Sequence, residues 1–302
     1  MLTAVGGTAG PPTGHMVIAA RARSVKGPWQ HAPNNPQVRT TDRSESWWSR
    51  GHATLIEGPA GDWWMISHGY ENGFWTLGRQ CLLEPIRWRE DGWFESLGGD
   101  LSTPFPKPLP SQHQPHGLPL SDDFSTSSLG PQWVFYDPSP VEHDRIDLDG
   151  DGLRMTAKGE TPADTSPLCV IPGDRAYEVT ARMELDPGSR AGLLLFYNSG
   201  LFCGLSYGPE GLVMHRYGQE RSRPNDLDAG LTHLEIKVRN DNHVVTFFTR
   251  LPGERWKKFD VQMEVSGYHH NTAYDFLSLR PGLMAAGKGH VRFSQFRYKA
   301  LS

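Results

Sequence analysis

Apolar and polar residues alternate one by one through several short stretches of the chain, and this period of two constrains the fold more than any other feature. In the stretch AYEVTARMEL, residues 176–185, Tyr177, Val179 and Met183 fall on one face while charged residues fall on the other. Residues 233–239 repeat the pattern. A period of two is typical of a half-buried β-strand. Because no stretch shows a convincing helical period and about ten such strands fill the second part of the chain, that part is predicted to be a two-sheet β-sandwich or jelly roll.

The first part of the chain is also predicted to be β-structure, with shorter and more aromatic runs. DWWMISHGY at 62–70 and GWFES at 92–96 are examples, and eight of the ten tryptophans precede residue 110. Short strands rich in glycine and aromatic residues are typical of β-propeller blades. A propeller needs at least four blades of about 40–50 residues, and this part has room for about two. Either the fold is not a propeller, or the chain holds only part of one.

A proline-rich stretch separates the two parts. It reads TPFPKPLPSQHQPHGLPLS over residues 103–121. Proline fixes φ and removes a backbone donor, so such a stretch is typical of a semi-rigid linker. The sequence is therefore divided into a partial propeller at 1–106, a linker at 107–120 and a β-sandwich at 121–302.

Charge and cysteine content exclude several classes of protein. The net charge is −4, and ten basic and ten acidic residues balance before residue 110, so the second part carries the whole negative charge. This disfavours a nucleic-acid or anionic-membrane partner, and no run approaches the roughly 18 apolar residues of a membrane span. Three distant cysteines without a CxxC pair exclude a disulfide scaffold and a zinc ribbon. No secretory signal is visible, and neither compartment nor oligomeric state is indicated.

Three residues of the first part could contact a sugar or an ion. Trp75, in the run YENGFW, offers a flat apolar face for the C–H face of a sugar, although core packing is the alternative. His52 follows a glycine and could bind an ion or a substrate, or could be hydrogen-bonded locally. Arg79 is flanked by apolar residues on a predicted strand and needs an acidic or hydroxyl partner, which a structural ion pair would also provide.

The second part offers two further candidates. Asp147, Asp149 and Asp151 alternate before a glycine as in the opening of a calcium loop, but the twelfth position is Lys158 instead of glutamate, so an acidic hairpin turn is predicted. Four aromatic residues could form a sugar-binding face of the sandwich or belong to its core: Trp133, Tyr207, Tyr217 and Trp256.

Three long stretches of the sequence resemble one known family. They are AVGGTAGPPTGHMVIAARARSVKGPW at 4–29, the run from WWSRGHATLIEG to REDGWF at 47–94, and RPGLMAAGKGHVRFSQFRY at 280–298. Together they resemble glycoside hydrolase family 43 of the β-xylosidase/α-L-arabinofuranosidase type, with a C-terminal concanavalin A-like β-sandwich. The resemblance implies an all-β fold, a five-bladed propeller of which only the last blades are present, followed by that sandwich. It also implies inverting hydrolysis of glycosidic bonds in carbohydrate metabolism, as in xylan degradation.

The resemblance also assigns expected roles to individual positions. Family members carry an aspartate base and a pKa-tuning aspartate in the first two blades, which have no counterpart here, and a glutamate acid in an Ala-Glu-Gly-Gly-Thr motif. This chain reads AVGGT at 4–8, so Val5 occupies the general-acid position and no catalytic residue is expected. His52 matches a histidine that often helps to hold a calcium ion near the propeller axis. Arg79 matches an arginine that contacts the sugar or the tuning aspartate. Substrate binding is expected from Arg79, His52 and Trp75.

Two functions of different classes follow from these expectations. The chain looks like an N-terminally truncated glycosidase of this family, whose partner is a xylo- or arabino-oligosaccharide and which by itself is inactive or severely impaired. Glu71, in YENGFW, is a weak substitute for the acid, because nothing in the sequence indicates the required geometry. The alternative is a non-catalytic carbohydrate-binding β-sandwich fragment.

Overall fold

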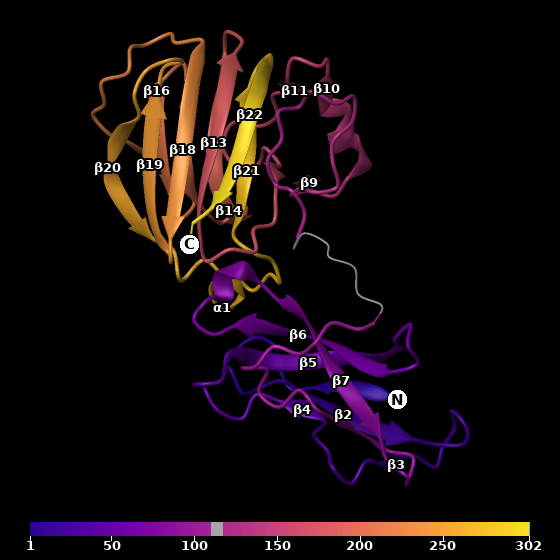
Figure 1. Cartoon of the computed structure of the whole chain (residues 1–302). Helices are drawn as coiled ribbons and strands as arrows, with labels where there is room; N and C mark the ends of the chain where they lie inside the picture. Colours follow the sequence, from indigo (N-terminus) through magenta and orange to yellow (C-terminus); the bar gives the residue numbers. More distant parts are fainter. Residues whose placement is uncertain (110–116, 302) are drawn as a thin grey trace. The chain divides into compact units, whose positions relative to one another are not determined.

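The computed structural model describes residues 1–109 and 117–301 of the chain. It divides into two compact units, Met1–Pro115 (unit 1) and His116–Ser302 (unit 2), which are described separately (Figure 1). Residues 110–116 of the predicted linker lie outside the described residues.

Unit 2 is built from two seven-stranded antiparallel sheets, as the alternating pattern predicts. The β13 sheet contains, in spatial order, β10 (Ile146–Leu148), β11 (Leu153–Thr156), β22 (His290–Ala300), β13 (Ala176–Leu185), β18 (His233–Asp241), β19 (Val244–Arg250) and β20 (Lys257–Glu264). The β14 sheet contains β17 (Gln219–Ser222), β16 (Gly211–Arg216), β15 (Leu201–Gly208), β14 (Ser189–Asn198), β21 (Arg280–Gly287), β12 (Leu168–Cys169) and β9 (Val134–Phe135).

The period of two in β13 separates the core of unit 2 from the outer surface. Tyr177, Val179 and Met183 are at most 1% exposed and join the main hydrophobic core, as predicted. The intervening Glu178 and Glu184 point to the other face and are more exposed. Burial of one complete face per strand contributes about 25 cal/mol for each Å² of apolar surface removed from water.

The central strand β14 is buried on both faces, which explains its uninterrupted apolar run. Leu193 and Leu195 belong to the main core. Leu194 and Phe196 belong to a second cluster on the opposite face of the same strand, together with Phe202 of β15. A strand buried on both sides loses the polar alternation of a half-buried strand.

Unit 1 contains two four-stranded antiparallel sheets, each with the number of strands in a propeller blade. The first comprises β1 (Leu2–Val5), β2 (Met16–Arg21), β3 (Gln30–His31) and β4 (Val38–Arg39). The second comprises β5 (Trp47–Glu57), β6 (Trp63–Glu71), β7 (Gln80–Trp88) and β8 (Phe94–Ser96). Buried residues of both sheets, including Val17 of β2 and Met65 of β6, share one hydrophobic core.

Helical structure is confined to short segments in the described parts of the chain. They are α1 (His270–Ala273) and the 3-10 turns η1 (Trp75–Leu77) and η2 (Pro140–Arg145). Over residues 1–109 and 117–301, no helix has the length and apolar character needed to cross a membrane.

The acidic run in the second part forms a hairpin turn, as predicted. Strands β10 and β11 pair directly, with Leu148 opposite Leu153, so the intervening residues form the turn. Both carboxylate oxygens of Asp149 accept hydrogen bonds of 2.7 Å from the guanidinium of Arg292 on β22. This pairing lowers the pKa of Asp149 to about 2. Asp149 therefore ties the hairpin to β22 of the sheet.

A buried histidine makes the stability of unit 2 sensitive to acid. His215 on β16 is inaccessible to solvent and shares a 2.7 Å hydrogen bond between its Nε2 and Oγ of Ser206. Burial, and to a smaller extent the cation of Arg190, lowers its pKa to about 3, although Glu220 lies 3.9 Å from Nδ1. The folded state therefore keeps His215 neutral at a pH where an unfolded chain would protonate it.

We predict that His215→Gln makes the unfolding free energy of unit 2 less dependent on pH. As pH falls from 6.5 towards 3, only the unfolded wild type gains the proton at this position, so the native protein loses stability. Between pH 7 and 4.5 the wild type should lose about 2 kcal/mol more than the variant, measured by denaturant unfolding. His233→Gln, at an exposed position, is the control. Parallel pH curves for wild type and His215→Gln would contradict the prediction.

Candidate functional site

Three histidines from three strand regions of unit 1 gather into one cluster. His15, next to the start of β2, stacks on His68 of β6, with 5.3 Å between ring centroids and 16° between ring planes. His52 of β5 lies 5.9 Å from His68, also between ring centroids. Nε2 of His15 and both ring nitrogens of His68 are buried and have no hydrogen-bond partner among the described residues. The cluster therefore presents ring nitrogens that can still donate or accept hydrogen bonds.

An irregularity in β5 positions His52. Pairing between β5 and β6 runs from Gly51 opposite His68 to Thr54 opposite Ile66, so the register shifts at this point. His52 adopts φ +53°, in the left-handed region that side-chain-bearing residues rarely occupy. Such strained bulges commonly re-aim a side chain next to a functional site. Here the bulge brings His52 towards His68.

Gly51 is required by the close approach of His15. A Cβ atom at position 51 would come within 3.0 Å of three atoms of the His15 ring. Gly51 thus leaves room for the imidazole of His15, and the next residue, His52, supplies a further imidazole to the cluster.

The backbone beside Val5 is part of the same arrangement. Val5 ends β1, opposite Met16 of β2. The carbonyl oxygen of the next residue, Gly6, accepts a 2.9 Å hydrogen bond from Nδ1 of His15. The position expected from the resemblance to hold a general acid therefore directly precedes the residue whose carbonyl binds His15. Its side chain is the half-buried isopropyl group of valine.

Arg79 lies close enough to His68 to influence its pKa, Tyr70 follows His68 by two residues on β6, and Trp75 packs on Tyr70. Arg79 is exposed and directly precedes β7, which begins at Gln80, so the predicted position of Arg79 within an apolar strand is wrong. The buried ring of Tyr70 packs on Trp75 at 4.5 Å between centroids, and Trp75 also contacts Trp48 at 5.1 Å. Trp75 thus has partners in the aromatic packing of unit 1 while remaining half-buried.

The surroundings of His68 favour its neutral imidazole. Burial, and to a smaller extent the positive charge of Arg79 and the neighbouring His15 and His52, lowers the pKa of His68 to about 4. Burial also raises the pKa of Tyr70, with smaller opposing contributions from Thr8 and Arg79. At neutral pH, His68 therefore carries one donor and one acceptor nitrogen, and Tyr70 keeps its proton.

These residues do not fit the calcium site that the resemblance implies. Calcium takes six to eight oxygen ligands, whereas the cluster offers imidazole nitrogens beside a guanidinium. In the parts of the chain that the structure describes, no group of three or more His, Cys, Asp and Glu side chains is placed to hold a metal ion. His52 therefore stays a predicted metal ligand that the surrounding side chains do not support.

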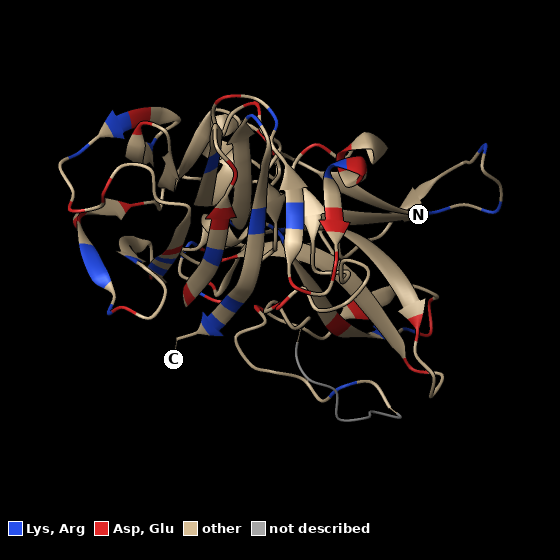
Figure 2. Ribbon diagram, turned by 90° about the horizontal axis from the view of Figure 1, so that it is seen from above, with Lys and Arg blue, Asp and Glu red and all other residues tan. Residues whose placement is uncertain are grey.

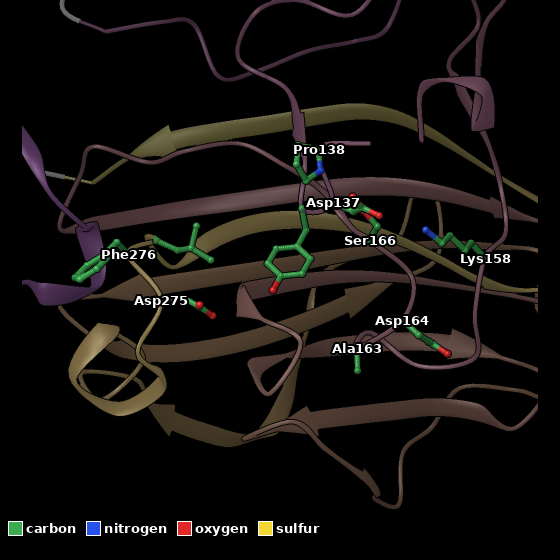
Figure 3. A pocket seen from close by; sticks show the side chains of 10 residues that line it. Asp137, Pro138, Lys158, Ala163, Asp164, Ser166, Asp275 and Phe276 are labelled. Atoms are coloured by element: carbon green, nitrogen blue, oxygen red, sulfur yellow. Dashed lines mark hydrogen bonds between the residues drawn. The ribbon is translucent and has the colours of Figure 1, made fainter. Parts of the chain in front are cut away.

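Unit 2 contains a separate hollow of about 560 Å³ (Figure 3). Three segments line it: the residues after β9, those before β12 and those after α1. Its aromatic walls are Tyr136 and the half-exposed Phe276. Asp275 is fixed there, because its main-chain oxygen accepts from the Tyr197 hydroxyl and its carboxylate accepts from Nδ2 of Asn198. Lys158, which also lines the hollow, is paired with Glu142.

Two of the four aromatic candidates in the sandwich belong to its core. Trp133 is 7% and Tyr207 1% exposed, and both pack in the main hydrophobic cluster. Tyr217 is 49% exposed and Trp256 is half-buried, so both reach the surface.

The sequence interpretation did not identify His15, His68, Tyr70 or the hollow in unit 2. His15 and His68 each stand at a strand in the runs GHMVIAA and ISHGY, which is the only signal that could have marked them. Their approach depends on the pairing of separate strands, and spacing along the chain does not specify it.

Comparison with known proteins identifies the family. Residues 1–94 match the model of glycosyl hydrolases family 43, and residues 121–299 match that of the beta xylosidase C-terminal concanavalin A-like domain. The chain belongs to glycosyl hydrolase family 43 and carries this C-terminal domain.

Two curated relatives share parts of the chain. A non-reducing end alpha-L-arabinofuranosidase of Bacteroides ovatus is 33% identical over 129 residues, which are 40% of this chain and 24% of the relative. A xylan 1,3-beta-xylosidase of a Vibrio species is 29% identical over 146 residues, which are 43% of this chain and 26% of the relative. Each match covers about a quarter of the relative's length.

Solved structures share the fold over nearly the whole chain. The GH43 BlXynB protein of Bacillus licheniformis superimposes with a TM-score of 0.85 at 23% identity. The xylan beta-1,4-xylosidase of Bacillus halodurans superimposes with a TM-score of 0.84, also at 23% identity. Each match covers 99% of this chain and 62% of the other. The likeness confirms the predicted fold class, propeller-type sheets followed by a concanavalin A-like sandwich.

We predict that Gly51→Ala displaces His15 and destabilises unit 1. Overpacking of a well-packed site typically costs about 1–3 kcal/mol. Denaturant unfolding followed by tryptophan fluorescence measures the loss. Gly267→Ala is the control, because a Cβ there meets no atom within 4 Å and its φ is not in the left-handed region. Equal stability of the two variants would contradict the packing argument.

Proposed function

We propose that this chain is a family 43 glycosidase polypeptide of the xylosidase/arabinofuranosidase type that binds a xylose- or arabinose-containing saccharide but does not hydrolyse it by itself. Family membership supports the class of reaction, which is hydrolysis of O-glycosyl bonds. The two curated relatives, one an arabinofuranosidase and one a xylosidase, support the pentose-containing substrate.

The unsatisfied imidazole nitrogens of the histidine cluster carry the binding part of the proposal. Buried polar atoms are normally hydrogen-bonded, so those of His15 and His68 point to a ligand or to water. Sugar hydroxyls both donate and accept, as a neutral imidazole does. Arg79 lies near His68, and Trp75 packs on Tyr70 of the same strand. We assign His52 and Arg79 to hydroxyl contacts and Trp75 to a sugar face.

The residues beside the cluster support binding rather than proton transfer. Inverting hydrolysis needs one carboxylic acid and one carboxylate base about 6.5–9.5 Å apart. The side chain of Val5 has no proton to give. His68, with a pKa of about 4, is not an imidazolium at neutral pH and therefore does not act as a general acid. Glu71 lies on β6 opposite Trp47, at the end of the strand beyond His68. These residues can orient a sugar and order its hydroxyls, but no two of them form a matched acid–base pair.

We predict negligible turnover of aryl β-xyloside and aryl α-L-arabinofuranoside by the 302-residue chain. Val5→Glu is also expected to stay inactive, because it adds an acid without a base. Release of the aryl group, followed by absorbance, measures the rate. Arg79→Gln is the control for contaminating enzyme. Robust turnover that Arg79→Gln abolishes would overturn the proposed inactivity.

A second candidate is carbohydrate binding by unit 2, which the hollow beside Phe276 favours. Tyr136 and Phe276 provide apolar ring surface at its walls, and fixed carboxylates such as Asp275 provide acceptors for sugar hydroxyls. A concave site with aromatic walls and a few convergent polar groups is the usual form of a small-ligand site.

We predict that Phe276→Ala weakens binding of a neutral xylo-oligosaccharide about 5- to 30-fold, because removal of an aromatic contact costs roughly 1–2 kcal/mol. Isothermal titration calorimetry measures the dissociation constant. Tyr274→Asn is the matched control: it removes an 86% exposed aromatic ring outside the lining, at a left-handed position that asparagine tolerates. Equal affinity of Phe276→Ala and wild type would exclude Phe276 from the binding site.

A further inference from the structure

The outer face of the β13 sheet carries a groove of about 350 Å³, separate from the sites described above. Strand alternation directs Arg182 of β13, Glu235 of β18 and Arg250 of β19 away from the core and into this groove. Figure 2 shows blue bands of Lys and Arg interspersed with red bands on the strands near the C-terminus. The groove is also lined by Trp256, Arg297 and Lys299.

One buried carboxylate forms the floor of the groove. Glu235 is 5% exposed and pairs with two guanidinium groups. Nη2 of Arg182 lies 2.8 Å from its Oε1, and Nη2 of Arg250 lies 2.6 Å from its Oε2. Nε of Arg182 also donates to Oε1, and Nε of Arg250 also donates to Oε2. Two cations share one anion, so the triad keeps a formal charge of +1 in a fixed geometry.

Two further cations come from β22. The ladder between β13 and β22 shifts register between Thr180 and Arg182, and Gln295 adopts φ +51° at this bulge. Beyond the bulge, Arg297 stands opposite Thr180 and Lys299 opposite Glu178. Within the described residues, Arg297 and Lys299 form no ion pair, whereas Glu178 lies 3.5 Å from Arg239. The lining therefore holds four cationic and two anionic side chains, in a chain of net charge −4.

Trp256 adds an aromatic wall. Cζ of Arg250 lies 4.3 Å and Nζ of Lys237 lies 5.0 Å from its ring, so cation–π contacts hold the indole at the groove. The indole is half-buried, which leaves part of it accessible.

We propose that this groove binds an acidic saccharide through a uronic-acid carboxylate. Arginine forks match a carboxylate in planar, bidentate geometry, and an indole suits the C–H face of a pyranose. The groove lining carries an excess of positive charge while the chain as a whole has a net charge of −4, which opposes binding of a long polyanion such as a nucleic acid. The choice of a saccharide rests on the proposed function, whereas the choice of an anion rests on the groove alone.

Calorimetry tests the inference with two ligands, a neutral xylo-oligosaccharide and the same oligosaccharide carrying one glucuronic acid. The acidic ligand is expected to bind the full chain about 10-fold more tightly at low salt, through one or two charge contacts. The double variant Arg297→Gln/Lys299→Gln should lose this advantage, and Arg223→Gln, an exposed arginine of unit 2 outside the groove, should keep it. Salt at about 1 M should also abolish it, because screening then acts within about 3 Å.

Each alternative result has a defined meaning. Equal affinity for the two ligands overturns the inference while leaving the proposed function intact if the neutral ligand binds. No binding of either ligand counts against both. Inorganic phosphate or a single-stranded oligonucleotide that displaces the acidic ligand at equal or lower concentration would show an unspecific anion site and would also overturn it. Trp256→Leu, which keeps all charges, should weaken the binding of both oligosaccharides at the groove. An unchanged affinity for both would remove the saccharide part of the proposal.

Discussion

The candidate site of unit 1 depends on a single steric constraint, the close approach of the His15 ring to the backbone of β5. Only glycine fits at position 51, and the strand is irregular directly after it, which turns His52 towards His68. His15 is fixed in turn by the carbonyl of Gly6, at the end of β1. Both four-stranded sheets of the unit thus contribute to one cluster, and displacement of this ring would disturb the contacts of β1, β5 and β6 together.

That geometry determines which chemistry the cluster can support. Burial, together with the nearby arginine and histidines, disfavours protonation of His68, so His68 remains neutral well below neutral pH. Neutral imidazoles order hydroxyl groups well, but a departing sugar oxygen needs a proton from an acid of raised pKa. The chain has valine where the resemblance implies that acid. Under the proposed function, these residues therefore bind a sugar without transferring a proton to it.

The fold was more predictable from the sequence than the site, for a physical reason. Alternation in β13 and β18 depends only on neighbouring residues, so it predicted which side chains face the core. The continuous apolar run of β14 also indicated a strand, but not burial on both faces. Arg79 was placed in a strand because apolar residues flank it, yet the strand begins one residue later and the side chain is exposed. His15 and His68 meet only through strand pairing across the unit, which local spacing cannot specify.

The outer faces of the two sheets of the sandwich differ in their chemistry. The outer face of the β14 sheet carries Leu194, Phe196 and Phe202. These side chains are at most 1% exposed, so that face is apolar and buried. The β13 sheet keeps charges there, and a buried carboxylate such as Glu235 is tolerated only because two guanidinium groups satisfy both of its oxygens. A hydrophobic residue in place of such a triad is often at least as stable. Stability alone therefore does not account for the arginines, whereas recognition of an anion does.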